Sequence, residues 1–262
     1  MIIGAVALVL ILFGGGLDTF FISELEKGVK EYVQDKDRRD EIQAGIKDTK
    51  KNIKAFNKER KSYFKQFKKL NISRATTSAE LDDFSDQMLT YRKAFQHRMI
   101  DDRLQLAANL KADEWASIIL LSNKTIEERE KKARAKAQKG SDKNKEQKNT
   151  AIFEDTRSVL AETVSEEPRL HTLTEGLNKL VRAVEQLELK IRSINQKENK
   201  TIALQYASRK DLESIANNTL KTGQVGFKML NEFHFLVLNN TSEAEFDEIM
   251  KAFSKELEIS IR

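Results

Sequence analysis

Mostly apolar residues recur in steps of four and three between residues 42 and 70. This heptad spacing keeps one face of a long helix against a partner helix. The same spacing returns 131 residues later, so the pattern predicts one helical module that occurs twice. The first seam comprises Ile42, Ile46, Thr49, Ile53, Phe56, Arg60, Tyr63, Phe67 and Leu70. The second comprises Leu173, Leu177, Leu180, Val184, Leu187, Ile191 and Ile194.

A second long helix is predicted after each seam. In the first half it covers residues 79–108, and a connector at residues 71–77 separates it from the seam. Two long helices joined so briefly run antiparallel, which predicts a helical hairpin. A short helix at residues 23–33 and a turn or solvated kink at residues 34–41 are expected before this hairpin, and a compact helix at residues 113–121 after it.

Capping residues support these boundaries. Ser78 is the predicted N-cap of the second helix, and Leu81 stands where a capping box would have an acid. In the second half, Ser242 and Glu245 form a complete capping box before the last helix.

The charged segment at residues 126–150 is the predicted domain boundary. It begins as a helix and ends in a polar stretch with nothing to bury, so a flexible basic linker is expected. The chain then divides into an anchor (1–22), a first module (23–125), the linker and a second module (151–262). Gly45 and Gly176, and Trp115 and Phe246, keep the same offset. The alternative is a chance alignment of two heptad helices.

Residues 1–22 predict a membrane anchor. Residues 1–13 carry no polar side chain and Asp18 is the first charge, and a helix of about 20 apolar residues spans a bilayer. No basic residue precedes this stretch, which favours an anchor over a cleaved signal peptide; a buried core helix is the third interpretation.

The orientation of this predicted anchor has two interpretations. The basic residues after it place the body in the cytoplasm by the positive-inside rule, but eight acids lie among them. Large domains also translocate largely regardless of charge. We favour a single-pass protein of the cell membrane whose body lies in the periplasm.

Composition favours an all-α fold. The 262 residues include a single proline, Pro168, and residues 46–138 contain neither glycine nor proline, the main helix breakers. The chain contains no cysteine, which excludes disulfides, thiolate metal sites and a cysteine nucleophile.

Candidate catalytic chemistry is sparse. His97, His171 and His234 have no second histidine at helical spacing, so packing or surface positions are expected rather than a metal site. No glycine-rich phosphate loop, nucleophile elbow or zinc-protease motif is present. We predict no enzymatic activity, no metal and no cofactor.

The clearest candidate interaction surface is basic. Residues 47–69 contain ten basic and two acidic side chains, and the equivalent residues 178–200 contain six basic and three acidic. Such a face binds anionic lipid headgroups or nucleic-acid phosphates, or is a solvated helix face. Its members are Lys47, Lys51, Lys54, Lys58, Lys61, Lys65 and Lys68. Trp115 and Phe246 join this candidate set, because they either plug the end of a hairpin or line a peptide pocket.

Residues 99–123, with the run Leu110-Lys111-Ala112-Asp113-Glu114-Trp115 after a hairpin, resemble in plan the membrane-anchored periplasmic proteins of the Spy-like and heavy-metal-sensor kind. Lys111 and Glu114 stand where that family has the threonine and glutamine of its Leu-Thr-x-x-Gln motif. The resemblance implies a chaperone-like or stress-related role.

Together, these features predict an all-α, non-enzymatic, membrane-anchored envelope protein with two tandem antiparallel hairpins. It would act through protein–protein contacts as a scaffold, sensor or stress component. The alternative is a binder of anionic lipid or nucleic acid through residues 47–69, with nucleic acid the less favoured.

Overall fold

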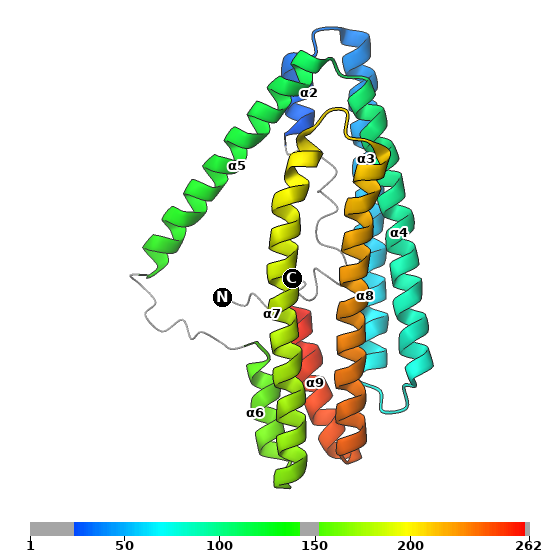
Figure 1. Ribbon diagram of the computed structural model, residues 1–262, viewed down its shortest axis with the longest axis vertical. Coiled ribbons are helices and arrows are strands. Elements are labelled where there is room, and N and C mark those ends of the chain that lie inside the picture. The colour runs from blue at the N-terminus through cyan, green and yellow to red at the C-terminus, as the bar shows by residue number, and fades with distance from the viewer. Residues whose placement is uncertain (1–23, 142–151, 260–262) are drawn as a thin grey trace.

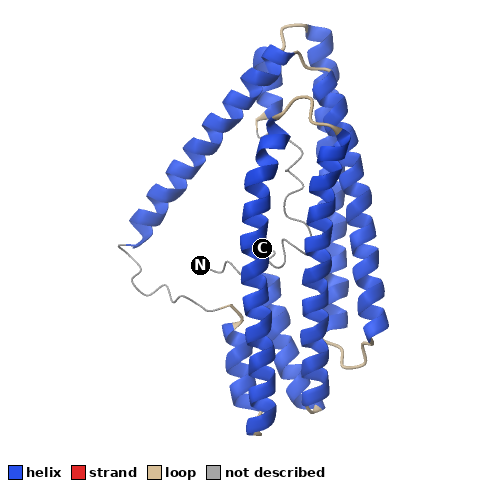
Figure 2. Cartoon of the chain, in the orientation of Figure 1, coloured by secondary structure: helices blue, strands red, loops and turns tan. Residues whose placement is uncertain are grey.

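The computed structural model describes residues 24–141 and 152–259. Within these ranges all regular secondary structure is helical (Figure 2), which confirms the predicted all-α class there. The helices of the first half are α2 (Leu25–Tyr32), α3 (Lys36–Asn71), α4 (Ser78–Ala108) and α5 (Ala112–Ser141). Those of the second half are α6 (Glu154–Thr163), α7 (Glu167–Ala203), α8 (Arg209–Asn240) and α9 (Glu243–Ile259).

The predicted anchor, residues 1–22, lies outside the described residues. Across the helices of residues 24–141 and 152–259, no segment is both long enough and apolar enough to span a bilayer.

The two long hairpins lie side by side and point in opposite directions (Figure 1). The connector between α3 and α4 is near one end of the molecule, and the connector between α7 and α8 is near the other. α4 packs along α8, and each also packs against its own hairpin partner. α2 and α5 cover one end, α6 and α9 cover the other, and the far part of α5 diverges from the bundle (Figure 1).

Equivalent helices begin at equivalent positions. The first residues of three helix pairs are each 131 residues apart: Lys36 and Glu167, Ser78 and Arg209, and Ala112 and Glu243. These positions agree with the offset of the two seams. The origin of the two halves by duplication stays a prediction.

The start of α3 differs from the sequence prediction. Residues 36–41 are helical rather than a turn or kink, because Asp35 acts as the N-cap and its side chain accepts a hydrogen bond from the Arg38 amide at 3.0 Å. The polar residues 36–41 were predicted to be a turn because they lack apolar positions. The N-cap at Asp35 allows them to form the first turns of α3 instead.

The start of α4 is also corrected. Its N-cap is Thr77 rather than Ser78, and Thr77 forms a complete capping box with Glu80. The Glu80 carboxylate accepts the Thr77 amide at 2.8 Å, and the Thr77 hydroxyl oxygen accepts the Glu80 amide at 3.3 Å.

The helix predicted at residues 113–121 is only the first part of α5, which continues through Ser141. Residues 126–141 of the predicted linker therefore belong to this helix, and residues 142–151 lie outside the described residues. Good helix formers on a charged, solvated surface are sufficient to continue a helix that packing has already nucleated.

The core joins the two halves. Its largest cluster contains Phe67 and Leu81 from the first half and Phe227, Phe246 and Phe253 from the second. The first seam packs against α4, where the ring of Phe56 stacks on Tyr91 at 5.3 Å and on Phe95 at 4.2 Å between centroids. The hairpins are thus two parts of one packed body.

Candidate functional site

An arginine–glutamate pair closes each end of the bundle. Arg38 at the start of α3 donates to both carboxylate oxygens of Glu114 on α5, at 2.6 and 2.5 Å, and to the Asn109 carbonyl at 3.3 Å. Arg169 makes the equivalent contacts to Glu245, at 3.0 and 3.3 Å, and to the Asn240 carbonyl at 3.2 Å. Each pair ties the start of one long helix to the helix that follows its hairpin.

The pKa values of the two carboxyl groups reflect these contacts. Hydrogen bonding from Arg38 holds the pKa of Glu114 below its ordinary value, despite partial burial. The pKa of Glu245 is lowered first by the Ser242 amide and then by Arg169. Both carboxylates are therefore held ionised as structural anchors.

Near one end of the molecule, the first half holds the connector of the second hairpin. Trp115 on α5 donates its indole N–H to the Ala203 carbonyl at 2.9 Å. Arg103 on α4 lies over the Trp115 ring at 4.3 Å and donates to the carbonyls of Ile202 and Leu204 at 2.8 and 3.0 Å. These bonds satisfy carbonyls at the C-terminal end of α7 that the helix leaves unpaired.

Near the other end, the second half holds the connector of the first hairpin. His234 on α8 lies 3.1 Å through Nδ1 from the Asn71 carbonyl, and Asn71 donates to the Ser254 hydroxyl at 3.2 Å. Arg74 lies 5.7 Å from the Phe246 ring centroid. Because Arg103 and His234 are 131 residues apart, the two ends use equivalent positions for the same task, as in a two-fold interface where residue contacts are reciprocal.

Trp115 and Phe246 belong to the core rather than to an exposed surface. Their side chains are 5% and 0% exposed. Each packs beside the connector of the opposite hairpin, so the packing interpretation fits their positions and the peptide-pocket interpretation does not.

The stability of the fold is expected to depend on pH through the buried His234. Its Nδ1–H donates to a carbonyl, Nε2 is buried without a hydrogen-bond partner in the described structure, and burial lowers the pKa of the imidazole. The unfolded chain therefore binds a proton more readily, and the free energy of unfolding should fall as the pH drops below about 6.5. Between about pH 7.5 and pH 5.5, the free energy of unfolding should decrease less in His234→Gln than in the unmodified chain. Urea unfolding at the two pH values measures this difference.

The exposed His171 provides the control for this prediction. His171→Gln should retain the full pH dependence of the unmodified chain. Equal pH dependence in His234→Gln and in the unmodified chain would contradict a role for His234.

A partly buried carboxylate, Glu256, caps a helix. Glu256 accepts hydrogen bonds from the Thr156 hydroxyl at 2.5 Å and from the Thr156 and Asp155 amides at 3.0 and 3.2 Å, which caps the start of α6. Burial raises the pKa of this carboxyl. His97 lies 3.7 Å from Glu213 at the surface. Among the described residues, no group of three or more histidine, aspartate or glutamate side chains could hold a metal ion.

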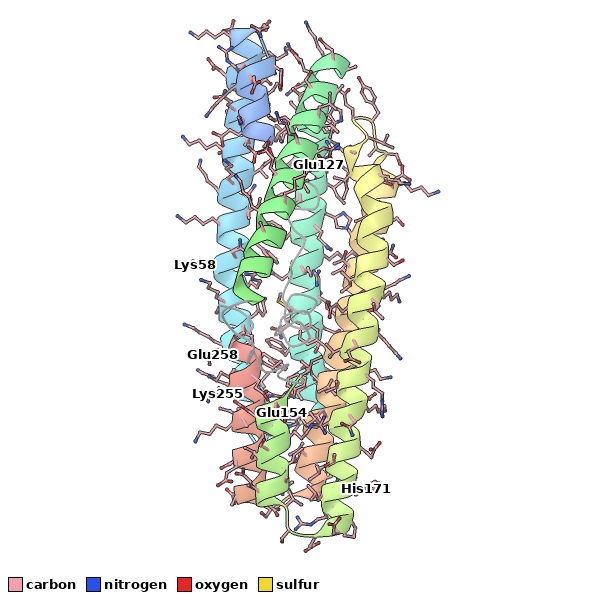
Figure 3. The ribbon with its side chains drawn as sticks, turned by 90° about the vertical axis from the view of Figure 1, so that its left-hand side faces the viewer. Lys58, Glu127, Glu154, His171, Lys255 and Glu258 are labelled. Carbon is pink, nitrogen blue, oxygen red and sulfur yellow. The ribbon has the colours of Figure 1, made fainter. Side chains whose placement is uncertain are left out.

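Six of the seven predicted surface lysines are exposed, and Lys68 is half-buried and salt-bridged to Glu258 at 2.6 Å. Figure 3 shows Lys58 at the edge of the molecule, on the outer side of α3. Lys51 pairs with Asp48 at 2.9 Å, and the neighbouring Lys50 pairs with Glu26. Lys54, Lys58, Lys61 and Lys65 form no salt bridge with any residue that the structure describes.

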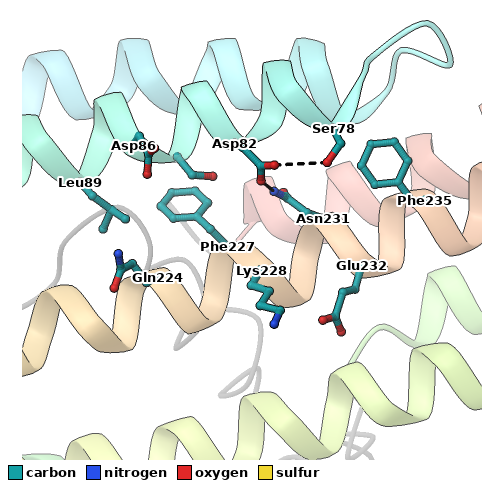
Figure 4. Close-up of a pocket in the computed structure, with 11 residues that line it drawn as sticks. Ser78, Asp82, Asp86, Leu89, Gln224, Phe227, Lys228, Asn231, Glu232 and Phe235 are labelled. Carbon is teal, nitrogen blue, oxygen red and sulfur yellow. Dashed lines mark hydrogen bonds between the residues drawn. The ribbon is translucent and has the colours of Figure 1, made fainter.

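A groove follows the contact between α4 and α8, a feature the sequence did not suggest. One part, of about 570 Å³, is lined by Asp82, Asp86 and Glu232 beside the apolar Phe227 and Phe235 (Figure 4). Asp82 already accepts hydrogen bonds from Ser78 at 3.2 Å and from Asn231 at 3.3 Å.

The adjoining part of this groove has a volume of about 460 Å³. Its lining consists of four residue pairs that are each 131 apart: Asp86 and Asn217, Leu89 and Leu220, Thr90 and Lys221, and Lys93 and Gln224. The groove therefore lies where the two halves meet symmetrically, and its polar side chains come from helices distant in sequence.

The sequence pointed to the lysines and to the equivalent Trp115 and Phe246, but it did not indicate Arg103 or the role of His234. Those two residues differ chemically, so the offset alone did not reveal that they do the same work. The repeated Arg38 and Arg169 were a usable signal, because each has a glutamate 76 residues later.

No protein-family model, curated protein or solved structure matches this chain.

Proposed function

We propose that this protein is a rigid, non-enzymatic helical scaffold, tethered to a membrane by residues 1–22. The observation that supports this most is the reciprocal capture of each hairpin connector by the other half. Capture at both ends stiffens a body whose longest helices, of 36 and 37 residues, extend for about 55 Å. Buried polar groups that would otherwise be candidates for acid–base chemistry, such as His234 and Glu256, are engaged in holding this body together.

A rigid helical bundle of this kind would act by binding partner proteins at its surface. Large apolar side chains are exposed at Leu120 on α5, Leu189 on α7 and Leu204 in the second connector, with 70%, 67% and 59% of each residue accessible. These side chains are available for contact with protein partners. The resemblance to Spy-like proteins adds envelope stress as the setting.

Photo-crosslinking in intact cells tests the scaffold. A photoreactive side chain at Leu120, Leu189 or Leu204 should yield a discrete product with one protein, whereas the same side chain at the buried Ile118 should yield none. Glutamate at the productive position should abolish complex formation without unfolding the chain. Failure of all three exposed positions to capture a specific partner would contradict the scaffold role.

The tether and its orientation are tested separately. The full chain should stay with membranes washed at about 0.5 M salt, which screens electrostatic attachment, and a chain lacking residues 1–23 should not. A reporter fused after Arg262 that is active only in the cytoplasm would overturn the periplasmic placement.

A further inference from the structure

Seven exposed lysines of α3 form one continuous line. At 3.6 residues per turn, all seven fall within about 40° of a common line along the helix. Every position of α3 in this sector between residues 47 and 69 is a lysine. This lysine stripe consists of Lys47, Lys51, Lys54, Lys58, Lys61, Lys65 and Lys69.

The lysine stripe is long and little neutralised. Its 23 positions span about 33 Å along the helix axis. The acids of this part of α3, Asp48 and Glu59, lie about 100° or more around the helix from the centre of the stripe. Only Lys51 among the stripe lysines forms a salt bridge with a described residue. The positive charge is therefore presented to solvent along a single straight edge.

We infer that the lysine stripe docks the bundle lengthwise on a membrane surface that carries anionic phospholipids. The outer side of a single helix meets a flat surface along a line parallel to its axis, and the lysines of the stripe lie along one such line. Basic side chains near an anionic bilayer are each attracted to the headgroups, and the attraction extends only over about one Debye length, so the charges must lie close to the surface together. A straight stripe satisfies that requirement for all seven ammonium groups.

The surroundings of the stripe favour lipid over nucleic acid. Single-stranded nucleic acids are bound in basic grooves with aromatic side chains on which bases stack. The aromatic residues of α3 are Phe56, Tyr63, Phe64 and Phe67; three are buried and Tyr63 is half-buried against α4. The groove between α4 and α8 is lined by residues of those two helices and by none of α3. The stripe thus has the charge but not the stacking surfaces of a nucleic-acid site.

The inference rests in part on the proposed tether, since an anchor at residues 1–22 would hold the stripe at a high effective concentration near the bilayer. The equivalent face of α7 provides an internal contrast. It carries Asn178, Glu185 and the exposed Leu189 where α3 has Lys47, Lys54 and Lys58. Docking through α3 therefore gives the bundle one defined side toward the membrane.

Chemical labelling of lysines on vesicles tests the docking. The full chain is mixed with vesicles of phosphatidylcholine, or of phosphatidylcholine with phosphatidylglycerol, and amine acetylation is measured at each stripe lysine by mass spectrometry. At low salt we expect labelling to fall about tenfold on the anionic vesicles only, and to recover at about 0.5 M salt, where the Debye length is short. Equal labelling on both kinds of vesicle would overturn the inference.

Two charge-matched variants sharpen this test. In Lys54→Gln/Lys58→Gln/Lys61→Gln, the affinity of the stripe for the anionic surface should fall about a hundredfold, so Lys47 and Lys65 should lose their protection. In Lys179→Gln/Arg182→Gln/Lys190→Gln on α7, which removes the same charge, the protection should remain. Equal effects of the two variants would indicate net charge rather than a docking face and would overturn the inference.

Different results would contradict the tether at residues 1–22 and the docking of the lysine stripe. A chain that does not co-sediment with phosphatidylcholine vesicles contradicts the tether, whereas salt-sensitive protection on anionic vesicles still supports the stripe. Protection of the stripe by a single-stranded nucleic acid, with none on anionic vesicles, would overturn docking to lipid.

Discussion

Replacing Phe246 with alanine is expected to lower the free energy of unfolding by about 3–5 kcal/mol, because a fully buried phenylalanine loses both its transfer energy and its packing. The Phe246 ring is 0% exposed and lies edge-on to His234, with 5.5 Å between centroids. Urea unfolding followed by circular dichroism would measure the change. Tyr206→Ala, at a residue that is 79% exposed, should change stability by no more than about 0.5 kcal/mol.

The same experiment examines whether the two halves share one core. Phe246 lies in a cluster that includes Phe67 and Leu81 from the other half. Its loss should therefore weaken the whole bundle in a single unfolding transition. A two-step curve, in which only the helices of the second half unfold early, would contradict a shared core, and a loss below about 1 kcal/mol would contradict tight packing at this site.

Replacing Glu114 with alanine is expected to lower the free energy of unfolding by about 2–4 kcal/mol, because it leaves the Arg38 guanidinium partly buried without its carboxylate. The Arg38 side chain is 22% exposed and that of Glu114 is 6% exposed. The Lys111 amide, which donates to Glu114 at 2.8 Å, also loses its acceptor. Denaturant unfolding at neutral pH measures this effect.

Three further variants distinguish lost charge pairing from lost packing at this end. Glu26→Ala removes a surface carboxylate that pairs with Lys30 and Lys50, and it should have almost no effect. Arg38→Met/Glu114→Leu should be more stable than Glu114→Leu alone, because no unpaired charge remains. If the double variant were the less stable of the two, the explanation by an orphaned charge would be wrong.

Because the pKa of Glu114 is lowered in the folded state, its contribution to the free energy of unfolding decreases at acidic pH. The carboxylate is favoured in the folded state, so its stabilising contribution is complete above the ordinary value near 4.5 and is lost as the pH falls through the lower folded pKa. His234 acts in a higher pH range, below about 6.5. The two groups therefore weaken opposite ends of the bundle in two successive pH windows.

The helices themselves were largely predictable because their signals are local. The seam of α3 and the connector can each be read from residues within a few turns of one another, and the repeat from comparing two such local patterns 131 residues apart. The errors also had local causes: caps at Asp35 and Thr77 were overlooked, and α5 continued through a charged stretch. The sequence could not indicate that Arg92 and Arg103 are 1% and 3% exposed, because a polar residue on a helix is ordinarily assigned to the solvent face.

By itself, the sequence determined the helical class, the two hairpins, their 131-residue offset and the basic face of α3, because heptad spacing and helix-breaker content act within single elements. Only the tertiary structure decided that the hairpins point in opposite directions and that each connector is held by the other half. The contacts of Trp115 with Ala203 and of His234 with Asn71 join residues 88 and 163 positions apart. No local sequence pattern predicts these contacts, because they depend on how α4 packs against α8 of the other hairpin.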